Sequence, residues 1–383
     1  MDFDFTDEQR MLRETARDFV SRFCPPEVAK RWDDEYGAPQ ELFEAFGKLD
    51  WLAIPFPEDY DGVGAGAVET TIVAEELGRA SFDVAMCYVT TLIVGLTVFK
   101  WAEEPRRREV IADLISGRRR FATAISEPDA GSDVGALRTR AEVHDDHFLL
   151  NGTKMWCTGA AQPNTTIAMY CRTTPGAQRR EGISLILVDP GTPGIEMRRI
   201  PTLARHGLGT YEVVIQDAVV PRENLIGPLG DGWQVLLSGL DLERVLITAG
   251  YVGAAQATVD EALEYSKQRV QFGRPIGDYQ ALSHALADIQ TEVDAARLLT
   301  YRAAWLAASG RPSAREGAMA KLYASETYVK AARWGMQIMA GYGFSTESVM
   351  SHRYRESIVA TISGGTSQMQ RNAIARSMGL KSR

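Results

Sequence analysis

Hydrophobic residues recur at helical spacing along the first 118 residues of the chain. Residues 6–9, Thr-Asp-Glu-Gln, fit a capping box, in which Thr6 and Gln9 satisfy free N–H groups of a first helical turn. The apolar positions that follow make one face of a helix; they are Leu12, Ala16, Phe19, Val20 and Phe23. The pattern predicts a helical domain over residues 1–118.

Between about residues 119 and 230 the apolar pattern becomes that of β-strands. The runs 141–143 and 148–150 flank Asp145 and Asp146, which is typical of a hairpin. The continuous apolar run 183–188 indicates a buried strand. These features predict a compact β domain over residues 119–230.

Helical periodicity returns for the rest of the chain. One apolar stripe consists of Leu282, Leu286, Ile289, Val293 and Ala296. Several long helices joined by short loops favour a four-helix bundle over residues 231–383. We therefore expect an α+β protein, mostly α, with three domains in the order helical, β, helical bundle.

The composition changes this picture little. The chain is 45% hydrophobic and 24% charged, and its net charge of −8 argues against nonspecific binding to nucleic acid or to an anionic membrane. The longest uncharged run, 84–99, contains Thr90, Thr91, Gly95 and Thr97 and is short for a membrane span, so we expect a buried helix there.

Cysteine and histidine spacing disfavours metal sites. The four cysteines are scattered without a Cys-x-x-Cys pair, which fits a reducing cytoplasm and not a disulfide framework or structural zinc. The five histidines form no His-Glu-x-x-His pattern. The sequence therefore predicts a cytoplasmic protein with no bound metal.

Five sequence blocks resemble the acyl-CoA dehydrogenase family. They are SEPDAGSD at 126–133, KMWCTG at 154–159, RVQFG at 269–273, QIMAGYGF at 337–344 and GTSQMQR at 365–371. The blocks stand in the family's order across nearly the whole chain. The resemblance implies the family's fold, a non-covalently bound FAD and a homotetramer.

The same resemblance implies roles for individual residues. Trp156 would pack against the isoalloxazine ring, and Thr158 would bond near its N5 atom. Arg269 would contact the pyrophosphate of the FAD of a neighbouring subunit, because a guanidinium group matches the geometry of phosphate oxygens. Phe272 would lie near the adenine of the same FAD. The other cofactor residues that the resemblance implies are Ser126, Ser132, Cys157, Gln280, Gln337, Gly341, Thr366 and Gln368.

The position of the catalytic base departs from the commonest family pattern. Many members carry a glutamate immediately before Gly-Thr-Ser-Gln, but this chain has Gly364 there. The segment 240–244, Leu-Asp-Leu-Glu-Arg, resembles the one that carries the catalytic glutamate in the isovaleryl-CoA dehydrogenase branch. The resemblance therefore implies that Glu243 takes the α-proton of an acyl thioester while a β-hydride goes to flavin N5. The amide of Gly364 would bind the thioester oxygen, as in an oxyanion hole.

Several residues beside these two are expected to contact the substrate. They are Ser132, Asp241, Arg244, Ser363 and Gly365. Family members often have an aromatic residue where this chain has Ser363, so we expect room for a branched, cyclic or otherwise bulky acyl group. Two smaller departures are residues 353–356, Arg-Tyr-Arg-Glu, where Met-Arg-Asp is usual, and Asp61, where glycine is common.

The sequence leaves several alternatives open. The acyl group could be carried by CoA or by an acyl-carrier protein, since both present the same pantetheine arm. Electrons could pass to an acceptor such as an electron-transfer flavoprotein, or to oxygen in an oxidase. A third reading is a non-catalytic flavin-binding partner subunit, and the presence of Glu243 argues against it.

Overall fold

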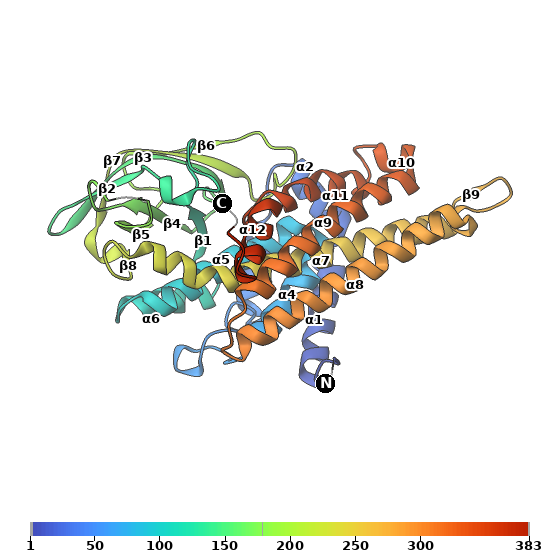
Figure 1. Cartoon of the computed structure of the whole chain (residues 1–383), viewed down its shortest axis with the longest axis horizontal. Helices are drawn as coiled ribbons and strands as arrows, with labels where there is room; N and C mark the ends of the chain where they lie inside the picture. Colours follow the sequence, from blue (N-terminus) through green and yellow to red (C-terminus); the bar gives the residue numbers. More distant parts are fainter. Residues whose placement is uncertain (1–2, 178, 382–383) are drawn as a thin grey trace. The chain divides into compact units, whose positions relative to one another are not determined.

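The computed structural model describes residues 3–177 and 179–381, except for the side chain of Asp241. Its first part is helical, as expected (Figure 1), with α1 (Asp7–Phe23), α2 (Pro26–Asp34), α3 (Gln40–Lys48), α4 (Ala67–Ala80), α5 (Phe82–Trp101) and α6 (Arg106–Ile115). The capping box is confirmed: Thr6 Oγ1 accepts from the Gln9 amide at 3.2 Å, and Gln9 Oε1 accepts from the Thr6 amide at 3.1 Å. The predicted apolar face of α1 is buried at Ala16 and Val20 but open at Phe23.

The middle of the chain forms an eight-stranded sheet in the order β6-β7-β3-β2-β4-β5-β8, and β1 pairs with β4. The strands are β1 (Arg120–Ala124), β2 (Arg140–Val143), β3 (His147–Thr158), β4 (Thr165–Arg172), β5 (Ile183–Val188), β6 (Ile195–Arg199), β7 (Thr210–Pro221) and β8 (Leu225–Ile226). The predicted hairpin is present as antiparallel β2 and β3. Every residue of β5 is buried, in agreement with its unbroken apolar run.

The last part is again helical, with α7 (Gly232–Gln268), α8 (Gln280–Ala308), α9 (Ala314–Met339), α10 (Gly341–Phe344), α11 (Val349–Ser357) and α12 (Ser367–Ser377). A short hairpin, β9 (Val270–Gln271) with β10 (Arg274–Pro275), joins α7 to α8. The predicted stripe on α8 is buried at Leu286, Ile289, Val293 and Ala296. The predicted fold class is confirmed.

Packing divides the chain into two compact units. The unit that we call the helical unit contains α1, α2, α4 and the chain from Asp241 to its C-terminus. The unit that we call the sheet unit contains Glu35–Ala65 and Cys87–Leu240, and thus α3 and the whole sheet. The N-terminal helices are therefore shared between the two units, while the domain boundaries near residues 118 and 230 stay predictions.

Helix α5 is the only helix in the described residues that is long and apolar enough to span a membrane by composition. Its most apolar window has a mean hydropathy of 1.9, yet 72% of that window is buried in the protein. Tyr88, Val89, Leu92 and Val98 are completely buried. This burial supports the expectation of a core helix.

The two small departures from the family pattern have structural explanations. Glu356 is completely buried, and its carboxylate accepts from the amides of Phe82 at 2.9 Å and Asp83 at 2.8 Å. It thereby caps the first turn of α5, where free N–H groups favour an anion. Asp61 adopts a left-handed conformation with φ of 59°, which aspartate tolerates better than most residues.

Candidate functional site

Trp156 is the most unusual residue of the sheet unit. Its φ is +62°, which is rare for a bulky residue, and 57% of it is exposed although tryptophan usually packs in a core. The register of β3 against β7 shifts between Lys154 and Cys157, so a bulge turns this ring outward. Thr158, two residues further along the strand, is partly exposed. An exposed flat ring in a strained backbone can serve as a platform for a planar ligand.

The side chain of Cys157 points the other way. It is completely buried in the apolar core of the sheet, and burial raises the pKa of its thiol to about 12. Only the main chain of Cys157 is available to a cofactor. The cofactor-binding role that the sequence implied for Cys157 therefore falls to its backbone atoms.

A buried ion pair supports the Trp156 platform. Lys154 Nζ lies 2.8 Å from Glu127 Oε1 and also donates to the carbonyl of Ile125 at 3.1 Å. The amide of Met155 donates to the carbonyl of Ser126 at 2.8 Å. Ser126, which is partly exposed, is thereby tied to the strand that carries the tryptophan.

The electrostatics of this pair are balanced by hydrogen bonds. Burial of Glu127 opposes ionisation, but the charge of Lys154 and the amides of Arg138 and Thr139 hold the pKa of Glu127 below its usual value. The carboxylate therefore stays ionised at neutral pH. Ser132 lies on the exposed part of the same connection between β1 and β2.

Glu243 is the titratable group of interest in the helical unit. It is partly exposed on α7, and its neighbours Leu242 and Val245 belong to an apolar cluster with Ala303 and Ala304. Burial raises the pKa of Glu243, and the charge of Arg244 opposes this only in part. Arg244 is partly exposed, and the side chain of Asp241 lies outside the described residues.

Gly364 lies over the same face of α7 as Glu243. A Cβ placed on Gly364 would be 3.4 Å from Cδ1 of Ile247, and Ile247 follows Glu243 by four residues, one helical turn. A turn further along, the Tyr251 hydroxyl lies 3.2 Å from the Ser363 hydroxyl. The structure thus brings Glu243, Gly364 and Ser363 to one surface, although they are far apart in sequence.

The amides at Gly364 and Gly365 are available to a ligand. Both glycines are exposed, with φ of +62° and +82°, and within the described residues neither amide donates to another protein atom. Thr366 caps α12 by accepting from the Met369 amide at 3.2 Å, and Gln368 is exposed on the first turn of that helix. Amides without a protein partner can donate to an anionic oxygen of a ligand.

The residues assigned to the outer part of the cofactor lie elsewhere on the helical unit. Arg269 and Phe272 are exposed on the β9–β10 hairpin, at the end of the α7–α8 pair (Figure 1), and Phe272 is 96% exposed. The guanidinium of Arg269 lies 5.7 Å from the ring centre of Tyr342 in α10, which begins at the exposed Gly341. Gln280 is exposed at the start of α8.

Gln337 lines a groove of about 880 Å³ between α8, α9 and the turn that ends at Thr361; Leu282 and Trp334 also line it. The lining is mainly apolar. The structure therefore leaves the outer cofactor residues open on the surface of the helical unit.

Comparison with known proteins identifies the family. The acyl-CoA dehydrogenase N-terminal, middle and C-terminal domain models match residues 6–118, 122–218 and 230–379. An acyl-CoA dehydrogenase of Bacillus subtilis is 37% identical over 377 residues, which are 97% of this chain and 98% of that protein. The chain belongs to the acyl-CoA dehydrogenase family.

Solved structures agree with this membership. The glutaryl-coenzyme A dehydrogenase in its glutaryl-CoA complex has a TM-score of 0.95 and 34% identity, covering 100% of this chain and 98% of that one. The FAD complex of PigA has a TM-score of 0.93 and 27% identity, covering 100% of both chains. The family resemblance seen in the five sequence blocks is confirmed.

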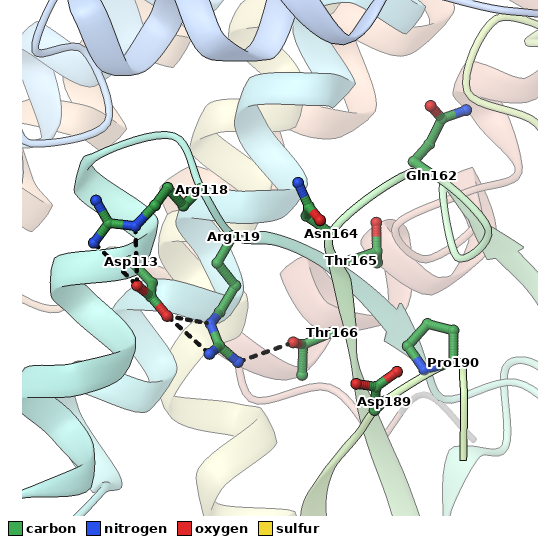
Figure 2. Close-up of a pocket in the computed structure, with 9 residues that line it drawn as sticks. All are labelled: Asp113, Arg118, Arg119, Gln162, Asn164, Thr165, Thr166, Asp189 and Pro190. Atoms are coloured by element: carbon green, nitrogen blue, oxygen red, sulfur yellow. Dashed lines mark hydrogen bonds and ion pairs between the residues drawn. The ribbon is translucent and has the colours of Figure 1, made fainter. Parts of the chain in front are cut away.

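A second pocket of this acyl-CoA dehydrogenase, shown in Figure 2, contains none of the assigned residues. It has a volume of about 380 Å³ and is lined by polar residues of the sheet unit, among them Arg118, Arg119 and Thr166. Asp113 pairs with Arg118 at 3.1 Å and with Arg119 at 2.9 Å, and Arg119 also donates to Thr166 at 3.2 Å. These interactions link α6 to β4. Because both guanidinium groups already bind the carboxylate, the described residues that line this pocket offer no unpaired cation to a ligand.

Sequence reasoning missed four residues beside Gly364: Ile247, Tyr251, Lys321 and Gln370. Lys321 carried a usable signal, since it is a single lysine between alanines and leucine on an apolar stretch of helix, 318–322. The other three look like ordinary core or helix residues, and only their contacts reveal them.

Proposed function

We propose that this protein is an FAD-dependent acyl-CoA dehydrogenase that removes hydrogen from the α and β carbons of an acyl thioester. The observation that carries the proposal is the surface shared by Glu243 and Gly364. It combines a carboxyl group whose pKa burial raises with two amides that have no other partner in the described chain. A carboxylate base with a raised pKa beside amides that can bind the thioester oxygen is the arrangement that α-proton abstraction needs.

The residues present fit FAD. Trp156 offers an exposed ring, Thr158 a hydroxyl on the same strand, and Arg269 an exposed guanidinium for a pyrophosphate. When bound, FAD supplies the acceptor for the β-hydride. By the family resemblance, Ser126, Ser132 and the main chain of Cys157 would hold its flavin part. Residues of a neighbouring subunit would complete the site; they are Gln280, Gln337, Gly341, Thr366 and Gln368.

The chain's own residues would divide the remaining work. Ionised Glu243 would accept the α-proton, and partial burial makes it a stronger base than an exposed glutamate. The amide of Gly364 would donate to the thioester oxygen and stabilise the negative charge that develops there. Arg244 and Ser132 would contact the rest of the thioester, together with Asp241, Ser363 and Gly365.

Anaerobic bleaching of the purified flavoprotein tests this function. Straight and branched acyl-CoA thioesters should bleach the flavin without oxygen, and carrier-bound thioesters should do so more slowly if CoA is the carrier. Failure of every thioester to bleach the flavin would refute dehydrogenation. A clear preference for straight acyl chains would refute the proposed bulky acyl pocket, which Tyr251 bounds beside Ser363.

We further propose a cytoplasmic homotetramer that passes electrons to an electron-transfer flavoprotein. All four cysteines are buried, and their scattered spacing suits a reducing compartment. The almost fully exposed Phe272 supports an oligomer, because a ring on a hairpin tip is stabilised only when another surface covers it.

Phe272→Ala should therefore weaken assembly and FAD retention while the single chain stays folded. Size-exclusion chromatography and flavin absorbance after dialysis would measure both, and we expect FAD to dissociate about 10-fold more readily, as for loss of one aromatic contact. Met11→Ala, at a residue that is 67% exposed on α1, is the matched control. Full retention of FAD and of oligomeric state in Phe272→Ala would contradict the proposed role.

A further inference from the structure

Lys321 is a buried cation whose hydrogen bonds end at the segment that carries Gly364. The residue is completely buried on α9, and its Nζ donates to the carbonyl of Ala360 at 2.9 Å and to the carbonyl of Gly365 at 2.7 Å. Burying an ammonium group is costly unless polar atoms replace its water. These two carbonyls lie on either side of residues 361–364, so Lys321 fixes both ends of that segment.

Gln370 reinforces the same segment from α12. Its Nε2 lies 3.1 Å from the carbonyl oxygens of both Gly364 and Gly365. A Cβ on Gly365 would stand only 2.7 Å from this nitrogen, so a side chain there would displace it. The left-handed conformation and the close approach together require glycine at position 365.

The orientation of these carbonyls determines where the amides point. In a trans peptide the C=O and N–H groups point in opposite directions. The carbonyls of Gly364 and Gly365 face Lys321 and Gln370, so the amides of Gly365 and Thr366, which complete those two peptide units, face away from these side chains. The Gly364 amide belongs to the preceding peptide unit, which lies within the segment that Lys321 holds at both ends. Gly364 and Gly365 are exposed, and within the described residues their amides bind no protein atom.

We propose that Lys321 is a positioning residue that holds the Gly364 segment so that its amide can bind the thioester oxygen. This inference rests on the proposed function, because it assigns a task within that reaction. Burial lowers the pKa of Lys321 to about 8, with Glu326 opposing and Arg244 adding to the shift. The group is therefore mostly cationic at neutral pH, and its charge strengthens both hydrogen bonds.

The test separates proton abstraction from hydride transfer. Tert-butylacetyl-CoA has α-hydrogens but no β-hydrogen, so it can exchange its α-protons with D₂O but cannot be dehydrogenated. Exchange is followed by NMR with wild type, Lys321→Met and Lys48→Met, the last being a control at an exposed lysine of α3 that pairs with Glu44. FAD content and thermal unfolding are measured on each holoenzyme.

We expect Lys321→Met to slow exchange by about 10²–10³-fold, the effect of losing one oxyanion-hole donor, while Lys48→Met exchanges like wild type. The FAD content of Lys321→Met should remain near that of wild type. A folded Lys321→Met that exchanges at the wild-type rate would overturn the positioning role.

If Lys321→Met does not fold, Gln370→Leu replaces it, since it removes the other donor to the same carbonyls. Slowed exchange in Gln370→Leu supports the inference, and a wild-type rate overturns it. Bleaching of wild type by an ordinary acyl-CoA is recorded in parallel. Its absence would refute the proposed function itself, whereas normal bleaching with unaffected variants would refute only the role of Lys321.

Discussion

Glu243→Gln should retain bound, yellow FAD, but its substrate should bleach the flavin about 10²–10⁴-fold more slowly than in wild type. This is the range for removal of a general base. Glutamine keeps the shape of the side chain but cannot accept the α-proton. Stopped-flow absorbance of the flavin with excess acyl-CoA measures the rate. Glu264→Gln, an exposed position on the same helix that pairs with Lys267, should bleach like wild type.

The raised pKa of Glu243 also predicts how the rate depends on pH. The base works only when ionised, so the bleaching rate should fall as the pH drops through the raised pKa. This fall should occur at a higher pH than for an ordinary glutamate. A bleaching rate in Glu243→Gln equal to that of wild type would refute the assignment of the base.

The raised pKa of Glu243 also affects the stability of the fold. Ionisation of Glu243, which the reaction needs, destabilises the folded state. The folded state disfavours ionised Glu243, so the penalty is absent below the ordinary pKa of glutamate, grows as the pH rises from that value to the raised pKa, and is complete above it. Glu243→Gln should therefore unfold at a higher temperature than wild type at neutral pH, and the gain should disappear in acid. Equal unfolding temperatures at neutral pH would contradict the burial argument.

Lys154→Met should destabilise the protein by about 3–5 kcal/mol, the usual cost of leaving one member of a buried ion pair without its partner. Lys154 is completely buried and Glu127 nearly so, and the pair joins the 126–133 segment to the strand that carries Trp156. We also expect FAD to be lost on dialysis. Denaturant unfolding followed by tryptophan fluorescence measures the first effect, and flavin absorbance the second.

A double variant serves as the control for the Lys154 prediction. Lys154→Met with Glu127→Gln should recover part of the lost stability, because no unpaired charge is left buried. Protonation of Glu127 should act in the same direction, so the deficit of Lys154→Met should shrink as the pH falls toward the lowered pKa of this carboxyl. A double variant less stable than Lys154→Met would show that hydrogen bonds of Glu127 dominate over its charge.

Features set by neighbouring residues could be predicted from the sequence alone. The capping box at Thr6 and Gln9 needs only four residues, and the β2–β3 hairpin needs only two short runs and a turn. The order helical, β, helical follows from periodicity, and the five blocks identified the family. Gly364, in place of the usual glutamate, implied that the catalytic base lies elsewhere, and the segment around Glu243 could be recognised from the sequence alone.

Only the tertiary structure decided how distant residues combine. Packing between α7, α9 and α12 brings together residues that are far apart in sequence. Ile247 and Tyr251 contact Gly364 and Ser363 on the face of α7 that carries Glu243. Lys321 and Gln370 bind the carbonyls of the same segment. Burial likewise turned the Cys157 thiol into the sheet core and the Trp156 ring outward. Local hydrogen bonds and hydrophobic periodicity depend on residues close together in sequence, so the sequence predicts them. Side-chain burial arises only when distant segments pack together, and burial in turn determines pKa values and the orientation of hydrogen-bond donors.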